Sequence, residues 1–376
     1  MKIAVIKETA EGERRVAATP ETVKKYVAFG ADVAVETGAG DGASIFDADY
    51  ETAGALVGAR AAVLKDADAV LAVQGPDPNS LDGIKKGAWL IASLNPFGDR
   101  DRVEDYARAG IEALALEFMP RITRAQSMDI LSSQANLAGY KAVLDGASEY
   151  GRAFPMMMTA AGTVSAARLF VMGVGVAGLQ AIATARRLGA QVSATDVRSA
   201  TKEQIMSLGA KPIFVENVAG IEGEGKGGYA TEMSEEYQKA QAELVSGHIA
   251  KQDIVVTTAL IPGRPAPRLI SDAQLASMRP GSVVVDLAAD AGGNVEGCVP
   301  GENVVKHGVT IIGATNLARS LAADSSALFA RNLFNFLSTF WAKEQGKLVL
   351  PDDDEIVKAI RLTQGGKVVN ERLTSS

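Results

Sequence analysis

Short apolar runs separated by polar, helix-forming stretches recur along the first third of the chain. KIAVIK at 2–7 and ADVAVE at 31–36 flank a segment in which Thr19 caps a helix, Pro20 takes its first position and Gly30 ends it. Further apolar runs lie at 67–74, 89–94 and 111–116, with Arg100 to Gly110 between the last two. Strands that alternate with helices predict a parallel sheet covered by helices on both faces.

A second series of apolar runs follows a long helical stretch. That helix is expected from about Ser127 to Ala153, where Pro155 stops it, and it would join two domains. The strands expected after it cover 167–173, 190–196, 211–216, 253–260, 282–288 and 309–315. This spacing suits a complete dinucleotide-binding domain.

The last stretch of the chain predicts a return to the first domain. Asp324 is expected to cap an amphipathic helix, and its apolar face has helical spacing. The residues of that face are Phe329, Leu333, Phe336, Leu337 and Phe340. We therefore expect an α/β fold of two Rossmann-like domains with parallel sheets, the first discontinuous (1–133 plus 321–376) and the second at 134–320. From Pro351 onward the charged, polar sequence predicts loose packing.

Composition and charge exclude several classes of protein. The 376 residues are 47% hydrophobic and 22% charged, as in ordinary globular proteins. A net charge of −7 argues against a nucleic-acid partner. The single cysteine, Cys298, forms no intrachain disulfide, and two histidines are too few for a histidine metal site, so we expect no metal. The uncharged stretch from Leu169 to Ala185 is too short and too glycine-rich for a membrane span, and the apolar start ends at Lys7, before a signal peptide.

A glycine fingerprint stands at the start of the second domain. Gly173, Gly175 and Gly178 fit G-x-G-x-x-G, with Val176 and Ala177 between the last two glycines. Alone the motif is weak, but here a strand leads into it and a helix leaves from it. The first glycine permits the tight turn, the second lets backbone approach a pyrophosphate, and the third lets helix and strand pack closely. An empty Rossmann-like turn is the alternative.

An acidic residue follows at the expected distance. The next strand ends at Asp196, eighteen residues after Gly178, with Val197 and Arg198 directly after it. A carboxylate here accepts hydrogen bonds from a ribose 2′-hydroxyl and repels a 2′-phosphate, which favours NAD(H) over NADP(H). Arg198, as a nearby cation, partly offsets this preference.

One segment is dense in glycine. From Gly220 to Gly228 five of nine positions are glycine, which predicts a mobile loop that continues to Met233.

Several stretches resemble one family over Met1 to about Phe340. They are RVAATPETVKK near the start, MPRITRAQSMDILSSQANLAGYKAV at 119–143, FPMMMTAAGT at 154–163, the fingerprint region at 173–198, and TTALIPGRPAP at 257–267. Together they resemble the NAD(H)-binding component of proton-translocating NAD(P) transhydrogenase. The wider fold is shared with alanine dehydrogenase, so RAQSMDILSSQ is the most specific stretch.

The resemblance implies roles for residues in that stretch. It places a loop in the cleft between the domains, where Arg121, Gln126, Asp129 and Ser132 face the nicotinamide and Tyr140 lies close by. Asp129 and Ser132 suit the carboxamide, and neutral Gln126 suits a bridge to a second nucleotide. The alternative is that Asp129 and Ser132 only cap the long helix.

The resemblance also implies a lid. The glycine-rich loop matches the mobile loop of the family, and its Gly228 and Tyr229 would fold over bound nucleotide. An exposed tyrosine on a flexible linker is the alternative.

Three functions are open on these residues. The alanine dehydrogenase relatives use a lysine and a histidine in the first domain, where this chain has Gln74 and Asn95, which do not titrate; Asp290 alone does not rebuild that site. Hydride transfer between two nicotinamides moves no substrate proton and needs no such pair. The other hypotheses are an amino-acid dehydrogenase of the alanine type and a non-catalytic NAD-sensing module.

A transhydrogenase function requires partners. The sequence has one glycine fingerprint and no predicted membrane span, so an NADP(H)-binding subunit and a membrane-spanning proton-channel subunit are expected on other chains. The chain would be cytoplasmic, peripheral on the inner face of the cell membrane through those subunits, and is expected to form a homodimer.

Overall fold

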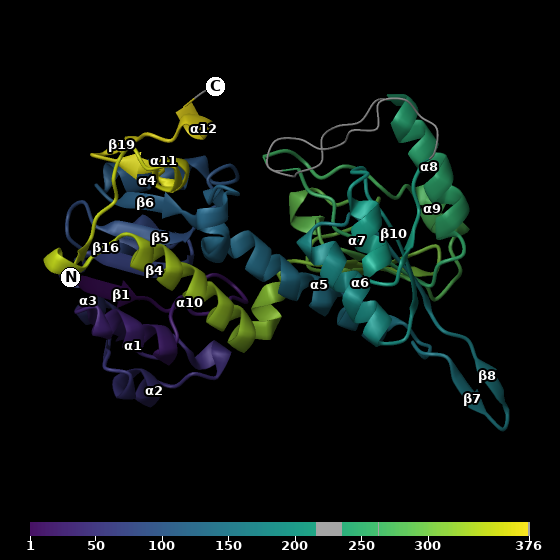
Figure 1. The fold of residues 1–376 in the computed structure, drawn as a ribbon, viewed down its shortest axis with the longest axis horizontal. Coiled ribbons are helices and arrows are strands. Elements are labelled where there is room, and N and C mark those ends of the chain that lie inside the picture. The colour runs from purple at the N-terminus through teal and green to yellow at the C-terminus, as the bar shows by residue number, and fades with distance from the viewer. Residues whose placement is uncertain (216–234, 262, 375–376) are drawn as a thin grey trace. The chain divides into compact units, whose positions relative to one another are not determined.

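The computed structural model describes residues 1–215, 235–261 and 263–374, which divide into two compact units. Unit 1 comprises Met1–Gln134 and Arg319–Ser376, and unit 2 comprises Ala135–Ala318. Helix α5 (Ile130–Glu149) carries the chain from the first unit into the second. The α/β class with two parallel-sheet domains, the first discontinuous, is thereby confirmed (Figure 1).

Unit 1 is built on a six-stranded sheet of order β3-β2-β1-β4-β5-β6, in which every pair is parallel. Its strands are β1 (Lys2–Val5), β2 (Asp32–Glu36), β3 (Leu56–Gly58), β4 (Ala69–Gln74), β5 (Trp89–Ser93) and β6 (Glu112–Ala115). Its helices before the crossover are α1 (Pro20–Ala28), α2 (Asp47–Thr52), α3 (Arg60–Leu64) and α4 (Arg100–Arg108). Thr19 caps α1 and Pro20 opens it, as the sequence predicts.

The returning segment completes unit 1. Helix α10 (Ala322–Thr339) packs beside α1, and its five predicted core residues are all buried in the core of this unit. The helix begins at Ala322, so the prediction that Asp324 caps it is wrong: Asp324 lies in the first turn, where a carboxylate still favours the positive end of the helix dipole. Residues 341–374 add short hairpins, β16 (Trp341–Ala342) with β17 (Lys347–Leu348) and β18 (Thr363–Gln364) with β19 (Lys367–Val368), and helices α11 (Glu355–Ile360) and α12 (Glu371–Thr374).

The prediction of loose packing after Pro351 is also wrong. Ile356, Val357, Ile360 and Leu362 are fully buried in the core of unit 1. The charged residues between them occupy the outer side of the short helix α11, which hides the apolar pattern in the composition.

Unit 2 contains a seven-stranded sheet of order β11-β10-β9-β12-β13-β15-β14. Its strands are β9 (Arg168–Met172), β10 (Gln191–Thr195), β11 (Lys211–Pro212), β12 (Ile254–Thr257), β13 (Val283–Asp286), β14 (Asn303–Lys306) and β15 (Val309–Gly313). All pairs are parallel except β14, an edge strand antiparallel to β15 that the sequence does not predict. The helices are α6 (Val176–Arg187), α7 (Thr201–Ser207), α8 (Glu235–Ile249) and α9 (Asp272–Ser277).

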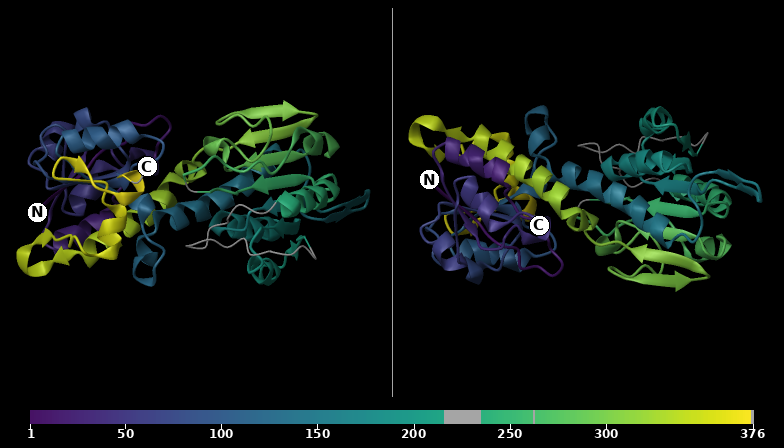
Figure 2. Two further views of the ribbon diagram at one scale, coloured as in Figure 1. Left: turned by 90° about the horizontal axis from the view of Figure 1, so that it is seen from above. Right: turned by 90° about the horizontal axis from the view of Figure 1, so that it is seen from below.

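A hairpin, β7 (Met157–Thr159) with β8 (Gly162–Val164), extends away from the sheet of unit 2 (Figures 1 and 2). Met156, Met157 and Met158 are 63%, 43% and 81% exposed. The sequence does not predict this hairpin, because MMMTAAGTV lacks the alternation of a half-buried strand.

The strand order in unit 2 reverses between β9 and β12. In open α/β sheets ligands bind outside the carboxyl ends of the strands at such a point. The fingerprint follows β9 and Thr258 follows β12, so both lie at this edge.

Candidate functional site

The glycine fingerprint forms the tight turn from β9 into α6. Gly173 adopts φ +96°, which side chains rarely tolerate, and a Cβ there would lie 2.7 Å from Oγ1 of Thr258. A Cβ on Gly178 would lie 2.0 Å from the carbonyl oxygen of Gly173, so strand and helix are in closest contact at that point. A Cβ on Gly175 would meet nothing within 4 Å. Two glycines therefore serve the turn and its packing, and Gly175 faces open space.

That open space lies at the start of α6. Gly175 is the N-cap and provides no side chain, so Val176 and Ala177 begin a twelve-residue helix whose first N–H groups have no side-chain cap. Such a terminus favours an anionic group, and the pyrophosphate of a dinucleotide meets both requirements, negative charge and close backbone approach.

Three hydrogen bonds hold the turn on the neighbouring strands. The N–H of Gly173 donates to the carbonyl of Thr195 at 2.9 Å, and the N–H of Val174 donates to Oδ2 of Asp196 at 2.6 Å. On the other side, the hydroxyl of Thr258 donates to the carbonyl of Gly173 at 2.9 Å. Thr258 does not stand out in the sequence, because its role depends on β12 lying beside β9.

Asp196 is 5% exposed and Arg198 surrounds its carboxylate. The guanidinium donates through Nε to Oδ1 and through Nη2 to Oδ2, both at 2.8 Å, and the backbone N–H of Arg198 donates to Oδ1 at 2.9 Å. Burial raises the pKa of Asp196, but these hydrogen bonds outweigh it and leave the pKa below its usual value. The carboxylate is therefore ionised at neutral pH, held toward the glycine turn, with Val197 between the two paired residues.

Gly139 of α5 is a second close approach at this site. A Cβ there would lie 2.0 Å from the carbonyl oxygen of Ala177, so α5 touches the first turn of α6. The signal in the sequence is a glycine in the middle of a helix, which normally costs stability and so indicates a packing reason. Tyr140, the next residue, is 37% exposed.

The RAQSMD block lies in unit 1, in a 3₁₀ turn over Thr123–Met128 directly before α5. Ala125 and Met128 are buried, whereas Arg121 and Gln126 are exposed. The turn thus rests on its apolar residues and presents the amide of Gln126 outward.

Asp129 and Ser132 contact each other at the start of α5. The N–H of Ser132 donates to Oδ1 of Asp129 at 3.0 Å, and its hydroxyl donates to Oδ2 at 2.6 Å. The capping geometry that the sequence left as an alternative is therefore present. It explains why α5 begins at Ile130 and not at Ser127, and it joins a carboxylate and a hydroxyl into one polar pair.

Gln74 and Asn95, which stand where alanine dehydrogenases have a lysine and a histidine, are both engaged within unit 1. The Gln74 amide donates to Oε2 of Glu13 at 2.9 Å, and the N–H of Asn95 donates to Oε1 of Glu117 at 2.5 Å. Glu8 accepts the N–H of Gln74 at 3.2 Å, and burial raises the pKa of Glu8 to about 7. These carboxylates support the ends of β4 and β5 through backbone bonds.

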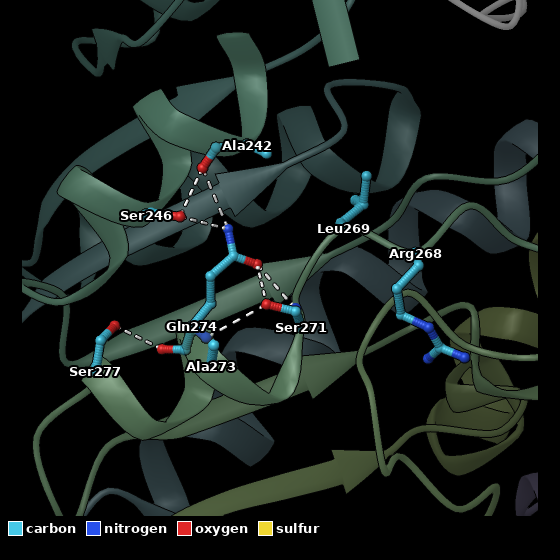
Figure 3. A pocket seen from close by; sticks show the side chains of 8 residues that line it. All are labelled: Ala242, Ser246, Arg268, Leu269, Ser271, Ala273, Gln274 and Ser277. Atoms are coloured by element: carbon cyan, nitrogen blue, oxygen red, sulfur yellow. Dashed lines mark hydrogen bonds between the residues drawn. The ribbon is translucent and has the colours of Figure 1, made fainter. Parts of the chain in front are cut away.

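A hollow of about 440 Å³ elsewhere in unit 2 is lined by α8, α9 and residues 268–271 (Figure 3). Its polar side chains bond one another: the amide of Gln274 donates to Ser246 at 3.0 Å, and the hydroxyl of Ser271 donates back to Gln274 at 3.2 Å. No predicted nucleotide residue lines it. The hollow is a by-product of helix capping, not the predicted site.

Gly228 and Tyr229, with the whole predicted loop Gly220–Met233, lie outside the described residues. Among the residues that the structure does describe, no helix has the length and apolar character needed to cross a membrane, and no group of acidic, histidine or cysteine side chains has the makings of a metal site.

Comparison with known proteins places the chain in a family. The model of the N-terminal domain of alanine dehydrogenase/PNT matches residues 4–138, and that of the C-terminal domain matches residues 142–371. The first of the chains that make up NAD(P) transhydrogenase subunit alpha in Rhodospirillum rubrum is 54% identical, over 100% of this chain and 99% of its own length. The crystal structure of transhydrogenase from Sinorhizobium meliloti superposes with a TM-score of 0.90 at 55% identity, covering 98% of this chain and 100% of that one.

Alanine dehydrogenase is a more distant relative. The enzyme of Mycobacterium tuberculosis is 30% identical over 80% of this chain and 76% of its own length. The resemblance stated from the sequence is thereby confirmed: the chain belongs to the alanine dehydrogenase/PNT family, among the NAD(P) transhydrogenase alpha subunits.

Proposed function

We propose that this chain is the NAD(H)-binding subunit of a proton-translocating transhydrogenase. It presents NADH for direct, Re/Si-specific hydride transfer to NADP⁺ on a partner subunit, and this transfer is coupled to proton movement across the membrane. The observation that carries the proposal is the glycine turn of unit 2, with open space before Gly175 and an ionised Asp196 beside it. Family membership already makes the chain a transhydrogenase component that binds a nicotinamide nucleotide.

The chemistry asks little of the residues of this chain. A hydride passes from C4 of one nicotinamide to C4 of the other, so the protein must hold the ring and exclude water. We assign the carboxamide to the Asp129–Ser132 pair, the contact with the second nucleotide to Gln126, and a supporting role to Arg121 and Tyr140. Gly228 and Tyr229 would close over the nucleotide.

Reconstitution tests this proposal against the alanine-type alternative. Mixed with the NADP(H)-binding and membrane-spanning subunits of a transhydrogenase, the chain is expected to reduce NADP⁺ with NADH; alone, it is expected to be inactive on alanine with NAD⁺. The reason is that Gln74 and Asn95 do not titrate and are bonded to Glu13 and Glu117. Steady NADH production from alanine by the isolated chain would favour an amino-acid dehydrogenase, and absence of transfer in the complex would refute the transhydrogenase.

The preference for NADH over NADPH is proposed to depend on Asp196. Asp196→Ala removes an acceptor for the 2′-hydroxyl and a repulsion toward a 2′-phosphate, so NADH affinity is expected to fall roughly tenfold to a hundredfold, as for loss of a charge-assisted bond. Because Asp196 also supports Val174, Asp196→Asn serves as the control that keeps an acceptor and removes the charge. Fluorescence titrations with both nucleotides measure the effect; equal affinities in the unmodified protein contradict the assignment.

The partner subunits would hold the chain on the inner, cytoplasmic face of the cell membrane. We propose in addition that two copies associate through the β7–β8 hairpin, whose methionines are exposed. Light scattering of the purified chain tests this, and a monomeric mass at micromolar concentration would contradict it.

A further inference from the structure

Two asparagines of α10 hold the turn that carries Gln126. Nδ2 of Asn332 donates to the carbonyl of Ser127 at 2.8 Å, and Nδ2 of Asn335 donates to the same carbonyl at 2.9 Å. The two asparagines are three residues apart, so they lie on one face of the helix, and a carbonyl oxygen accepts two hydrogen bonds. The backbone between Gln126 and Asp129 is therefore fixed by side chains that lie more than 200 positions away in the sequence.

Asn332 also reaches the start of α5. Its Oδ1 accepts the hydroxyl of Ser133 at 2.7 Å, while its Nδ2 bonds Ser127. One side chain thus bridges the residues on either side of Asp129 and Ser132. Asn332 is 7% exposed, and both ends of its amide are satisfied by this bridge, so its orientation is determined.

Burial alone does not fix this segment. Ala125 and Met128 anchor the turn in the core, but Ser127 is exposed and a six-residue 3₁₀ turn has poor internal hydrogen bonds. A second tie, from Arg124 to Asp354 at 2.8 and 2.9 Å, is partly exposed and lies at the other end of the turn. The asparagine pair is the tie next to the Asp129–Ser132 pair.

We infer that Asn332, assisted by Asn335, is a positioning residue that sets the Asp129–Ser132 pair and Gln126 for the nicotinamide. The inference rests on the role proposed above for these three residues. It gives a reason for the return of the chain to unit 1: α10 supplies the amides that the turn cannot supply itself.

The test compares two ligands on the full chain. ADP-ribose has the adenine, riboses and pyrophosphate of NADH but no nicotinamide. Asn332→Ala is expected to weaken NADH binding roughly tenfold, the loss expected when a bridge of two hydrogen bonds is removed, and to leave ADP-ribose binding within about twofold. Asn335→Ala removes one of two donors and is expected to have a smaller effect in the same direction. Calorimetric titration measures all four values.

A matched control separates positioning from general stability. Ser326, also on α10 and fully buried, accepts the N–H of Val16 at 3.0 Å and does not touch the turn. Ser326→Ala is expected to lower Tm and to leave the ratio of NADH to ADP-ribose affinity unchanged. If Asn332→Ala keeps the native ratio, the inference is overturned; if it does not fold, the ratio in Asn335→Ala and Asn332→Asp decides in the same way. If the unmodified chain binds ADP-ribose as tightly as NADH, the role proposed for the block fails along with the inference.

Discussion

Gly178→Ala is expected to destabilise unit 2 and to abolish measurable NADH binding. The added Cβ would lie 2.0 Å from the carbonyl oxygen of Gly173, a backbone atom held in place by the hydroxyl of Thr258. Relief requires that α6 move away from β9, which displaces the helix terminus that we propose meets the pyrophosphate. Overpacking of this kind costs about 3 kcal/mol, and we expect NADH affinity to fall by a hundredfold or more.

Gly175→Ala is the matched control in the same motif. A Cβ there meets nothing within 4 Å, and the backbone at φ −79° suits any residue, so Tm is expected to stay unchanged. NADH affinity should still fall, because the methyl group would occupy the space where backbone approaches the pyrophosphate. Thermal unfolding and NADH titration of both variants give the result. Native NADH affinity in Gly175→Ala would show that the dinucleotide does not pass this residue, and native Tm and affinity in Gly178→Ala would refute the close contact.

The sequence predicted the alternation of strands and helices well, since buried parallel strands are continuous apolar runs. All six strands predicted for unit 2 are present, within one to four residues at their ends. Strand β14 escaped prediction because an exposed edge strand has no apolar run: Val305 is 69% exposed. Helix α11 escaped because six residues are too few to display a helical period among the charges of 352–361.

The local portion of the candidate site was likewise open to prediction. The fingerprint and Asp196 lie within one strand–helix–strand unit, so their spacing along the chain indicates their proximity in space. Thr258, Asn332 and Asn335 could not be found in this way, because each bonds a segment 85 or more positions away. Only the sheet order and the return of α10 bring them to their partners.

Gln126→Asn is expected to slow hydride transfer in the reconstituted complex on the order of a hundredfold. Buried Ala125 and Met128 and the doubly bonded carbonyl of Ser127 fix the backbone around Gln126, so shortening its side chain by one methylene withdraws the amide without an alternative turn conformation. A misplacement of about 1 Å between reacting groups has a cost of this size. The amide is neutral and both donates and accepts, so it favours neither redox state of the ring by charge.

NADH affinity of the isolated Gln126→Asn chain should stay within a few-fold, because we assign Gln126 to the second nucleotide. Asp129→Asn and Ser132→Ala differ in this respect. Each breaks the 2.6 Å bond between the two residues that we assign to the carboxamide, so each should weaken NADH binding as well as slow transfer. Stopped-flow transfer from NADH to NADP⁺ on the partner subunit, run beside equilibrium titration, separates the two patterns. A normal transfer rate in Gln126→Asn would exclude this side chain from positioning the second nucleotide, and the hydride step would then depend on the Asp129–Ser132 pair alone within the RAQSMD block.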